Sequence, residues 1–170
     1  MFEYDPHKQY PKQTESRVII RFQDCDPLQH LNNAKYFDYF FNAREDQVPK
    51  LYGVEIMDFI KKYKAAWVVY NHQISYVRPA NVGEWVRIMS RVIWYNENSL
   101  VVEYYMTDDN EQELKTLLWT TLRYIDMKTA KTTPHEGAVL DYLKAALVPG
   151  VDFQNLTMRE RIKQIKEELK

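Results

Sequence analysis

The chain has 170 residues, enough for one domain with a terminal extension and too few for two full domains. Hydrophobic residues make up 45% of the chain and charged residues 28%, with only 4 Gly and 7 Pro, which excludes a disordered or low-complexity protein. The net charge of −1 excludes a nucleic-acid binder that depends on bulk positive charge.

The sequence carries no signal for export or membrane insertion. It begins MFEYDPHKQYP, which lacks the basic and then apolar order of a secretory signal, and no run reaches about 18 apolar residues. The single cysteine, Cys25, cannot form an intramolecular disulfide. We therefore expect a soluble, cytoplasmic protein with no membrane partner.

The first third of the chain predicts an arm, a strand and a long helix. Residues 1–16 are polar and read as an N-terminal arm, and the alternation over residues 17–23 predicts a half-buried strand. Apolar residues then recur at helical spacing from about residue 33 until Gly53, with Asn32 or Asn33 as the N-cap. This helix is apolar around so much of its circumference that we expect it to be buried on more than one side.

Four strands are predicted after a polar, lysine-rich stretch at residues 58–64. The alternating segments cover residues 67–77, 84–95, 100–107 and 114–126, and their short connections suit antiparallel hairpins. Strand, long helix and four-strand meander together predict an α+β fold. The side chains expected to share one face in each segment are, in turn, Val68, Tyr70, His72, Ile74 and Tyr76; Val86, Ile88, Ser90, Val92 and Trp94; Leu100, Val102, Tyr104 and Met106; and Leu114, Leu118, Leu122 and Tyr124. On the opposite face of the strand at 67–77 the polar side chains are Asn71, Gln73 and Ser75.

Two helices are predicted at the C-terminal end. Thr133 and Thr157 each precede a glutamate by three residues, the spacing of a capping box. The second of these helices has one apolar stripe among mixed charges, which indicates a face that docks on the protein rather than a membrane binder. We divide the chain into an arm (residues 1–16), a main domain (17–150) and a helical extension (151–170).

The densest group of reactive side chains lies between the first strand and the long helix, from Asp24 to Asn33. First-turn amides of a helix are free donors, so they can polarise a carbonyl while a nearby carboxylate acts as base or nucleophile. The structural alternative is that Asp24 and Asp26 shape a turn and His30 forms a local hydrogen bond. The residues alone leave both interpretations open.

Other chemistries have weaker support in the sequence. In an extended chain Cys25 points away from Asp24 and Asp26, and only His30 is near enough in sequence to act as its base. The same two aspartates and His30 lack the second histidine of a typical metal site. The four glycines are scattered, so no phosphate-binding loop is predicted. His72, on an apolar strand face, is expected to lie in the core or line a pocket.

Two segments resemble a known family. The run FQDCDPLQHLNNAKYFDYFFNAR is similar to the signature of hot-dog-fold acyl-CoA thioesterases of the 4-hydroxybenzoyl-CoA thioesterase type, and ISYVRPANVGEWVRIMSRV resembles their second strand and following turn. The resemblance covers residues 17–126. It implies a sheet wrapped around a central helix, side-by-side dimers with active sites between subunits, a catalytic carboxylate at Asp26 and a backbone amide near Asn33 that holds the thioester oxygen.

A second likeness concerns the turn itself. The run QHLNN also resembles the plant acyl-ACP thioesterase motif, in which an Asn and a His two residues later are catalytic. His30 matches that histidine, but Leu28 stands where the asparagine would be. Gln29 replaces a glycine that is common in the CoA enzymes.

We therefore expect a hydrolase that cleaves an acyl-CoA, with no metal and no cofactor other than the CoA of the substrate, in a homodimer or a dimer of dimers. Two alternatives are a non-hydrolytic acyl-CoA or acyl-carrier binder on the same fold and a helix-and-curved-sheet cone that binds small ligands. The residues expected to contact the acyl group are Tyr36, Phe40 and His72, with His30 nearby, and those expected to contact the CoA phosphates are Arg78, Arg87 and Arg91.

Overall fold

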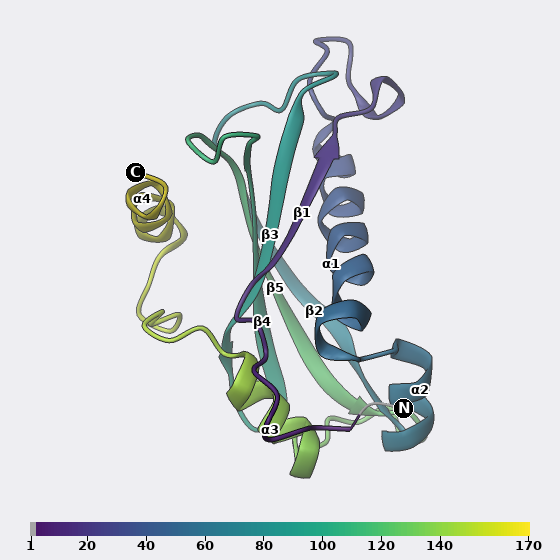
Figure 1. The fold of residues 1–170 in the computed structure, drawn as a ribbon. Coiled ribbons are helices and arrows are strands. Elements are labelled where there is room, and N and C mark those ends of the chain that lie inside the picture. The colour runs from purple at the N-terminus through teal and green to yellow at the C-terminus, as the bar shows by residue number, and fades with distance from the viewer. Residues whose placement is uncertain (1–2) are drawn as a thin grey trace.

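The structure, a computed structural model that describes residues 3–170, contains one five-stranded antiparallel sheet with a long helix along one face (Figure 1). The sheet order is β1-β3-β4-β5-β2. The helix, α1 (Tyr36–Tyr52), lies on the concave side, so the predicted α+β arrangement is confirmed. The strands are β1 (Thr14–Ile19), β2 (Ala65–Tyr76), β3 (Trp85–Tyr95), β4 (Ser99–Asp108) and β5 (Leu114–Asp126).

Helix α1 begins and ends where its sequence signals predict. The Asn32 side chain accepts a hydrogen bond from the Ala34 N–H at 3.0 Å and starts a 3-10 turn (Asn33–Lys35) that leads into the helix. Gly53 ends the helix with φ of 70°, a left-handed conformation that costs a glycine little. The predicted cap at Asn32 is confirmed.

The expectation that α1 is buried on more than one side is wrong for the single chain. Tyr36, Phe40 and Ala43 are buried against the sheet, whereas Asp38 and Asp46 are exposed on the outer surface. Phe37 and Phe41 lie at the boundary and are partly buried. The sheet curves around the helix without closing over it, so one flank of the aromatic helix stays open.

Bulges change the predicted faces of two strands. The register of β2 shifts between Val69 and Asn71, and this turns Trp67 into the same core as Ile74, although the two residues differ in parity. Val68 and Tyr70, predicted to share a face with Ile74, are exposed instead. A bulge in β3 turns Trp94 away from Val86 in the same way, and Leu114 of β5 packs on the opposite side of the sheet from Leu118.

Three further elements, a strand and two helices, differ from the prediction. β1 starts at Thr14 and ends at Ile19, so Phe22 lies in a 3-10 turn (Phe22–Asp24) and is 83% exposed. The lysine-rich stretch forms a helix, α2 (Ile56–Tyr63), because Ile56, Phe59, Ile60 and Tyr63 recur at helical spacing on one face. Helix α3 (Gly137–Ala146) begins after Glu136 without a side-chain cap, so the capping box predicted at Thr133 is wrong.

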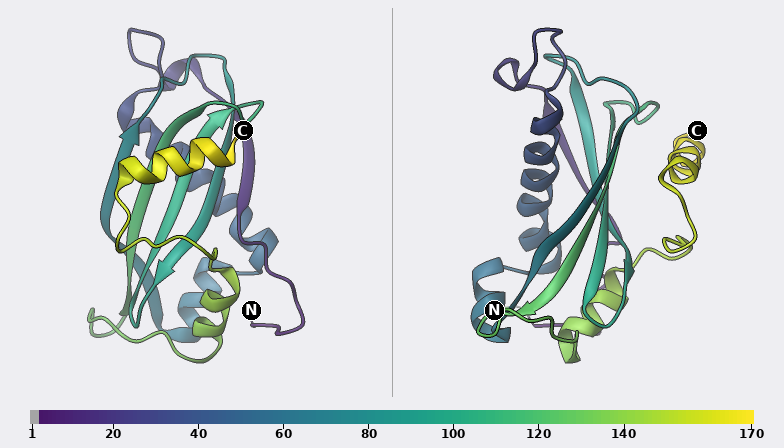
Figure 2. Two further views of the ribbon diagram at one scale, coloured as in Figure 1. Left: turned by 90° about the vertical axis from the view of Figure 1, so that its left-hand side faces the viewer. Right: turned by 180° about the vertical axis from the view of Figure 1, so that it is seen from behind.

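The outer face of the sheet is covered by the C-terminal helix α4 (Met158–Glu168), as Figure 2 shows. Its predicted capping box is present, with Thr157 and Glu160 bonded reciprocally. Met158 and Ile165 are buried in a second apolar cluster with strand residues such as Leu117. The expectation of a docking face is confirmed. No helix among residues 3–170 is both long and apolar enough to cross a membrane.

A buried ion network lies beneath α4. Glu103 is fully buried and accepts hydrogen bonds from Arg91, Arg161 and the Trp119 indole at 2.8–2.9 Å. Burial alone would raise the pKa of Glu103, but the hydrogen bond from Arg161 and the two nearby guanidinium charges hold it below its ordinary value. A depressed carboxyl pKa means that this network stabilises the fold above that ordinary value and loses its contribution in acid, as the pH falls through the folded-state pKa.

We predict that Arg161→Met lowers the free energy of unfolding by about 3–5 kcal/mol, because it leaves the Glu103 carboxylate buried with one cation fewer. Arg159→Met, at an exposed position on the same helix, is the matched control and should change it by less than about 0.5 kcal/mol. Urea denaturation of both variants measures the difference. Equal stability of the two variants would contradict the structural role given to this network.

Candidate functional site

The two segments that carry the family resemblance lie against each other at one end of the sheet. Backbone hydrogen bonds join Leu31 N to Ala80 O at 2.8 Å and Val82 N to Gln29 O at 2.9 Å. Two further bonds connect Ile20 with Gly83 and Glu84. The loop at residues 20–33 is therefore fixed to the turn at 80–84 by main-chain groups. These bonds do not depend on which side chains the loop carries.

Within this loop the chain folds back on itself. Asp24 O accepts from Asn32 N at 2.9 Å, and Asp26 N donates to His30 O at 2.8 Å. The turn between them needs a left-handed residue, and Gln29 supplies it with φ of 64°. This is the position at which the sequence departs from the glycine common in the CoA enzymes, and the turn keeps the conformation that a glycine would favour.

The two aspartates of the loop differ in how their carboxylates are used. The Tyr39 hydroxyl donates to Asp24 Oδ2 at 2.9 Å, and the Lys35 ammonium lies 4.0 Å from Oδ1, so both Asp24 oxygens face partners. Asp26 Oδ1 accepts from the amides of Leu28 and His30 at 2.9 and 3.1 Å. Among residues 3–170, Asp26 Oδ2 has no hydrogen-bond partner. Asp26 is thus held rigidly by one oxygen while the other stays available.

The start of α1 offers a free donor. In the turn that precedes the helix, the N–H groups of Asn32, Ala34 and Lys35 are all bonded, but that of Asn33 finds no acceptor within the described part of the chain. The Tyr76 hydroxyl donates to Asn33 O at 3.0 Å, in the next peptide along the chain, and so holds Asn33 on its C-terminal side. A fixed, unpaired amide at a helix start is the kind of group that can polarise a carbonyl oxygen.

The cysteine between the aspartates is poorly suited to be a nucleophile. Its thiol donates to Arg21 O at 3.3 Å. Burial and the charges of Asp24 and Asp26 raise the pKa of Cys25, which lowers the fraction of reactive thiolate.

The predicted acyl contacts are placed along α1. Tyr36 and Phe40 are fully buried between helix and sheet, with the Tyr36 hydroxyl accepting from Ala80 N at 3.3 Å. His72 faces α1 from β2, its ring 5.0 Å from Phe37 and 5.6 Å from Phe41 between centroids. Burial lowers the pKa of His72, which bonds Thr120 through Nδ1 at 3.0 Å. His30 pairs with Asp26 and Asn81 through its backbone.

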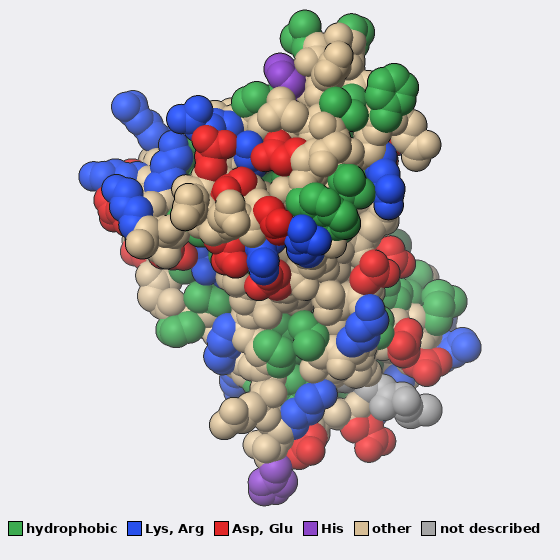
Figure 3. All heavy atoms as spheres, turned by 45° about the horizontal axis from the view of Figure 1, so that its top comes forward, with side chains coloured by type: hydrophobic (Ala, Val, Ile, Leu, Met, Phe, Trp, Pro, Cys, Tyr) green, Lys and Arg blue, Asp and Glu red, His purple; other side chains and the backbone are tan. Residues whose placement is uncertain are grey.

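The structure does not bring the three predicted phosphate contacts together. Arg78 pairs with Glu113 at 3.0 Å, and Arg87 contacts three carboxylates on the far side of β1 and β3. Arg91 is enclosed under α4 in the Glu103 network. Positive and negative side chains intermingle at the end of the molecule that carries the loop, without a patch of one sign (Figure 3). Among residues 3–170, no group of three or more His, Cys, Asp or Glu is placed to hold a metal ion.

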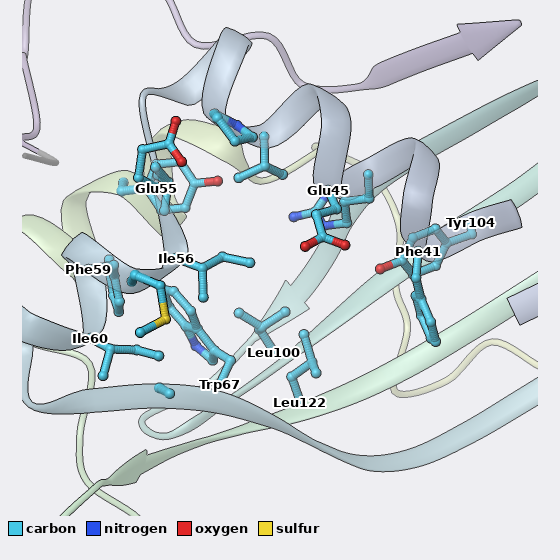
Figure 4. Close-up of a pocket in the computed structure, with 17 residues that line it drawn as sticks. Phe41, Glu45, Glu55, Ile56, Phe59, Ile60, Trp67, Leu100, Tyr104 and Leu122 are labelled. Carbon is cyan, nitrogen blue, oxygen red and sulfur yellow. The ribbon is translucent and has the colours of Figure 1, made fainter. Parts of the chain in front are cut away.

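A cavity that the sequence did not indicate lies further along α1. It measures about 580 Å³, is bordered by α1, α2 and the sheet, and is partly open at the surface. Its lining is mainly apolar, with Phe41 and Tyr104 at one end and Phe59, Ile60 and Trp67 at the other (Figure 4). Sequence reasoning missed it because α2 was not predicted and the β2 bulge, which turns Trp67 inward, leaves no clear pattern in the sequence.

Comparison with known proteins agrees with this architecture. The family model described as the thioesterase-like superfamily matches residues 20–149. The long-chain acyl-CoA thioesterase FadM of Escherichia coli (strain K12) is 29% identical over 133 residues, which are 76% of this chain and 96% of that protein.

Solved structures share the fold. The structure of YbaW, a probable thioesterase from Escherichia coli, matches with a TM-score of 0.70 at 26% identity, covering 79% of this chain and 99% of its own. The 12:0-ACP thioesterase from Umbellularia californica reaches a TM-score of 0.73 at 13% identity, covering 86% of this chain and 55% of its own, which shows the fold alone.

We predict that Gln29→Gly raises the free energy of unfolding by about 0.5–1 kcal/mol, because a side chain in the left-handed region costs energy that glycine avoids. Leu28→Gly, at a neighbouring exposed residue outside that region, should be neutral or destabilising. Thermal melting of both variants measures the effect. A lower melting temperature for Gln29→Gly would mean that the turn depends on the glutamine side chain.

Proposed function

The chain belongs to the thioesterase-like superfamily, and from this premise we propose that it hydrolyses the thioester bond of a fatty acyl-CoA with Asp26 as the catalytic carboxylate. The observation that carries the proposal is the divided use of the Asp26 carboxylate. One oxygen is fixed by two backbone amides, and the other is unpartnered among residues 3–170. A carboxylate held in this way needs no further ordering before it acts on a bound substrate.

Asp26 supports hydrolysis by either of two routes. As a general base, its Oδ2 takes a proton from water while the water oxygen attacks the thioester carbonyl. As a nucleophile, the same oxygen attacks that carbonyl and forms a mixed anhydride, which water then hydrolyses. Both routes expel CoA as a thiol and leave a free fatty acid.

The developing negative charge on the carbonyl oxygen needs a donor, and we assign this role to the Asn33 amide. It is unpaired in the described chain, it stands in the turn that leads into α1, and Tyr76 bonds the carbonyl of the same residue. The positive end of the helix macrodipole adds to its effect. One such donor is worth about 10²–10³ in turnover in comparable sites.

The choice of substrate rests on the relatives and on the surface along α1. FadM is named as a long-chain acyl-CoA thioesterase, and the helix that starts at Asn33 is lined with aromatic rings such as Phe37 and Phe41. An apolar acyl group fits this surface better than a polar one. A protein that binds acyl-CoA without cleaving it would bind the same surface but would not need a free carboxylate oxygen.

We predict that Asp26→Asn lowers kcat by about 10²–10⁴-fold on an acyl-CoA substrate, with release of free CoA as the readout. Asparagine keeps a carbonyl oxygen that can accept from the Leu28 and His30 amides, so the turn and the melting temperature should be preserved. A well-folded variant with near-normal turnover would remove Asp26 from the mechanism. Absence of CoA release by the unaltered protein across acyl lengths would favour the binding protein instead.

Cys25→Ala is the matched control in the same loop. Its thiol donates to the Arg21 carbonyl, and its raised pKa disfavours the thiolate, so kcat should stay within about twofold of the unaltered protein. Loss of activity comparable to that of Asp26→Asn would point to a thiol mechanism.

We further propose that the protein forms a homodimer through β2. This strand is a sheet edge of 12 residues, and Val69 and Tyr70 on it are 52% and 59% exposed. The other edge, β1, is half as long and carries the charged side chains Glu15 and Arg17, which deter pairing. An unpaired apolar edge of this length is the natural place for a second copy to add its own strand.

Light scattering at micromolar concentration should give twice the monomer mass, and Val69→Asp should shift it towards the monomer because the partner strand would bury the new charge. Phe22→Asp, at an exposed apolar residue in the turn after β1 at the opposite edge of the sheet, should leave the mass unchanged. A monomer at this concentration would contradict the proposed dimer.

A further inference from the structure

We propose that Lys115 of β5 is a positioning residue for the reaction. Its buried ammonium holds the turn at residues 80–84, and through this turn it holds the Asp26 carboxylate in place relative to the Asn33 amide. The inference rests on the proposed function, which assigns the reaction to Asp26 and Asn33. It adds a residue that lies far from both in the sequence and acts on them only through other groups.

Lys115 is a buried cation between two carboxylates. It is the second residue of β5 and is 5% exposed, and its Nζ lies 2.8 Å from Glu84 Oε1 and 2.8 Å from Glu113 Oε2. Burial alone would lower the pKa of Lys115, but the hydrogen bonds to Glu113 and Glu84 hold it above its ordinary value. The ammonium therefore stays charged, and hydrogen bonds between charged partners are stronger than those between neutral ones.

Glu84 connects this ammonium to the catalytic loop. Its Oε1 faces Lys115, and its Oε2 accepts from the backbone N–H of Asn81 at 2.8 Å and from the side-chain amide of Asn81 at 3.2 Å. Asn81 forms a β-bridge with His30, whose N–H donates to Asp26 Oδ1 at 3.1 Å. A continuous series of contacts thus leads from the Lys115 ammonium to the fixed oxygen of Asp26.

The main chain of Lys115 holds the other side of the site. Because β4 and β5 lie between β2 and β3 in the sheet, the connection at residues 77–84 crosses the ends of both strands. The carbonyl oxygen of Lys115 accepts from the two N–H groups that follow Tyr76, at 2.9 and 3.0 Å. The Tyr76 hydroxyl in turn bonds Asn33 O. One residue therefore connects the segment that holds Asn33 with the segment that holds Asp26.

Glu84 and Glu113 form a matched pair for testing this role. Both bond the same ammonium at the same distance, but the other side-chain partner of Glu113 is Arg78, which lies outside the loop at 20–33 and the turn at 80–84. An amide has one acceptor oxygen where a carboxylate has two, so Glu84→Gln cannot bond both the ammonium and the Asn81 N–H. Glu113→Gln takes one negative charge from the same cation and leaves the turn intact.

The test measures steady-state CoA release from an acyl-CoA, together with hydrogen exchange of the amides in residues 20–33 by mass spectrometry. We expect Glu84→Gln and Lys115→Met to lower kcat about 10–100-fold, because a misplaced carboxylate loses its alignment with the bound thioester. KM should change less than about threefold, since the buried ammonium adds no contact to the bound substrate. Loop exchange should be faster in both variants, and Glu113→Gln should leave kcat and exchange unchanged.

The partly exposed Glu84 tolerates substitution better than the buried lysine, so Glu84→Gln carries the comparison if Lys115→Met fails to fold. If the unaltered protein cleaves acyl-CoA but Glu84→Gln matches Glu113→Gln in kcat and exchange, the positioning role is wrong and the hydrolase stands. A higher KM with unchanged kcat in Glu84→Gln also overturns this role. If the unaltered protein cleaves no acyl-CoA, yet loop exchange is faster in Glu84→Gln than in Glu113→Gln, the control of the loop by Lys115 stands and the hydrolase is wrong.

Discussion

The backbone hydrogen bonds between the loop at residues 20–33 and the turn at 80–84 are the constraint on which the site depends. They join segments about 50 residues apart in the chain and involve main-chain atoms of Leu31, Ala80, Gln29 and Val82. Because the loop is held at its base, Asp26 can give one oxygen to the turn and keep the other free. The same attachment fixes the start of α1, so carboxylate and helix amide belong to one rigid unit.

Much of the fold could be predicted from local patterns. The helix from residue 33 to Gly53, the meander and the cap at Thr157 all have short-range signals, and the structure confirms them. The thioesterase resemblance is confirmed by the family match over residues 20–149. The sequence did not predict which side chains of β2 and β3 face the core, because each strand contains a bulge. A bulge depends on the pairing with the neighbouring strand, and alternation within one strand carries no information about that pairing.

Part of the candidate site could likewise be predicted from the sequence, and part could not. Asp26 and the helix start stand out in sequence because the turn, the cap and the carboxylate are neighbours in the chain. The arginines chosen for CoA could not be judged, since their carboxylate partners, such as Glu113 for Arg78 and Glu103 for Arg91, come from other strands. The cavity is lined by Phe41 from α1, Phe59 from α2 and Leu122 from β5, and only the folded chain brings these segments together.

The C-terminal helix limits how several copies of the protein can associate. Since α4 lies across the outer face and seals Glu103 beneath it, a second sheet cannot stack on that face unless the helix first leaves. Its departure would strip the buried carboxylate of a guanidinium partner. The sheet can therefore be extended only at its edges, by a strand that pairs with an edge strand. The C-terminal extension prevents the sheets of two molecules from packing face to face on this side.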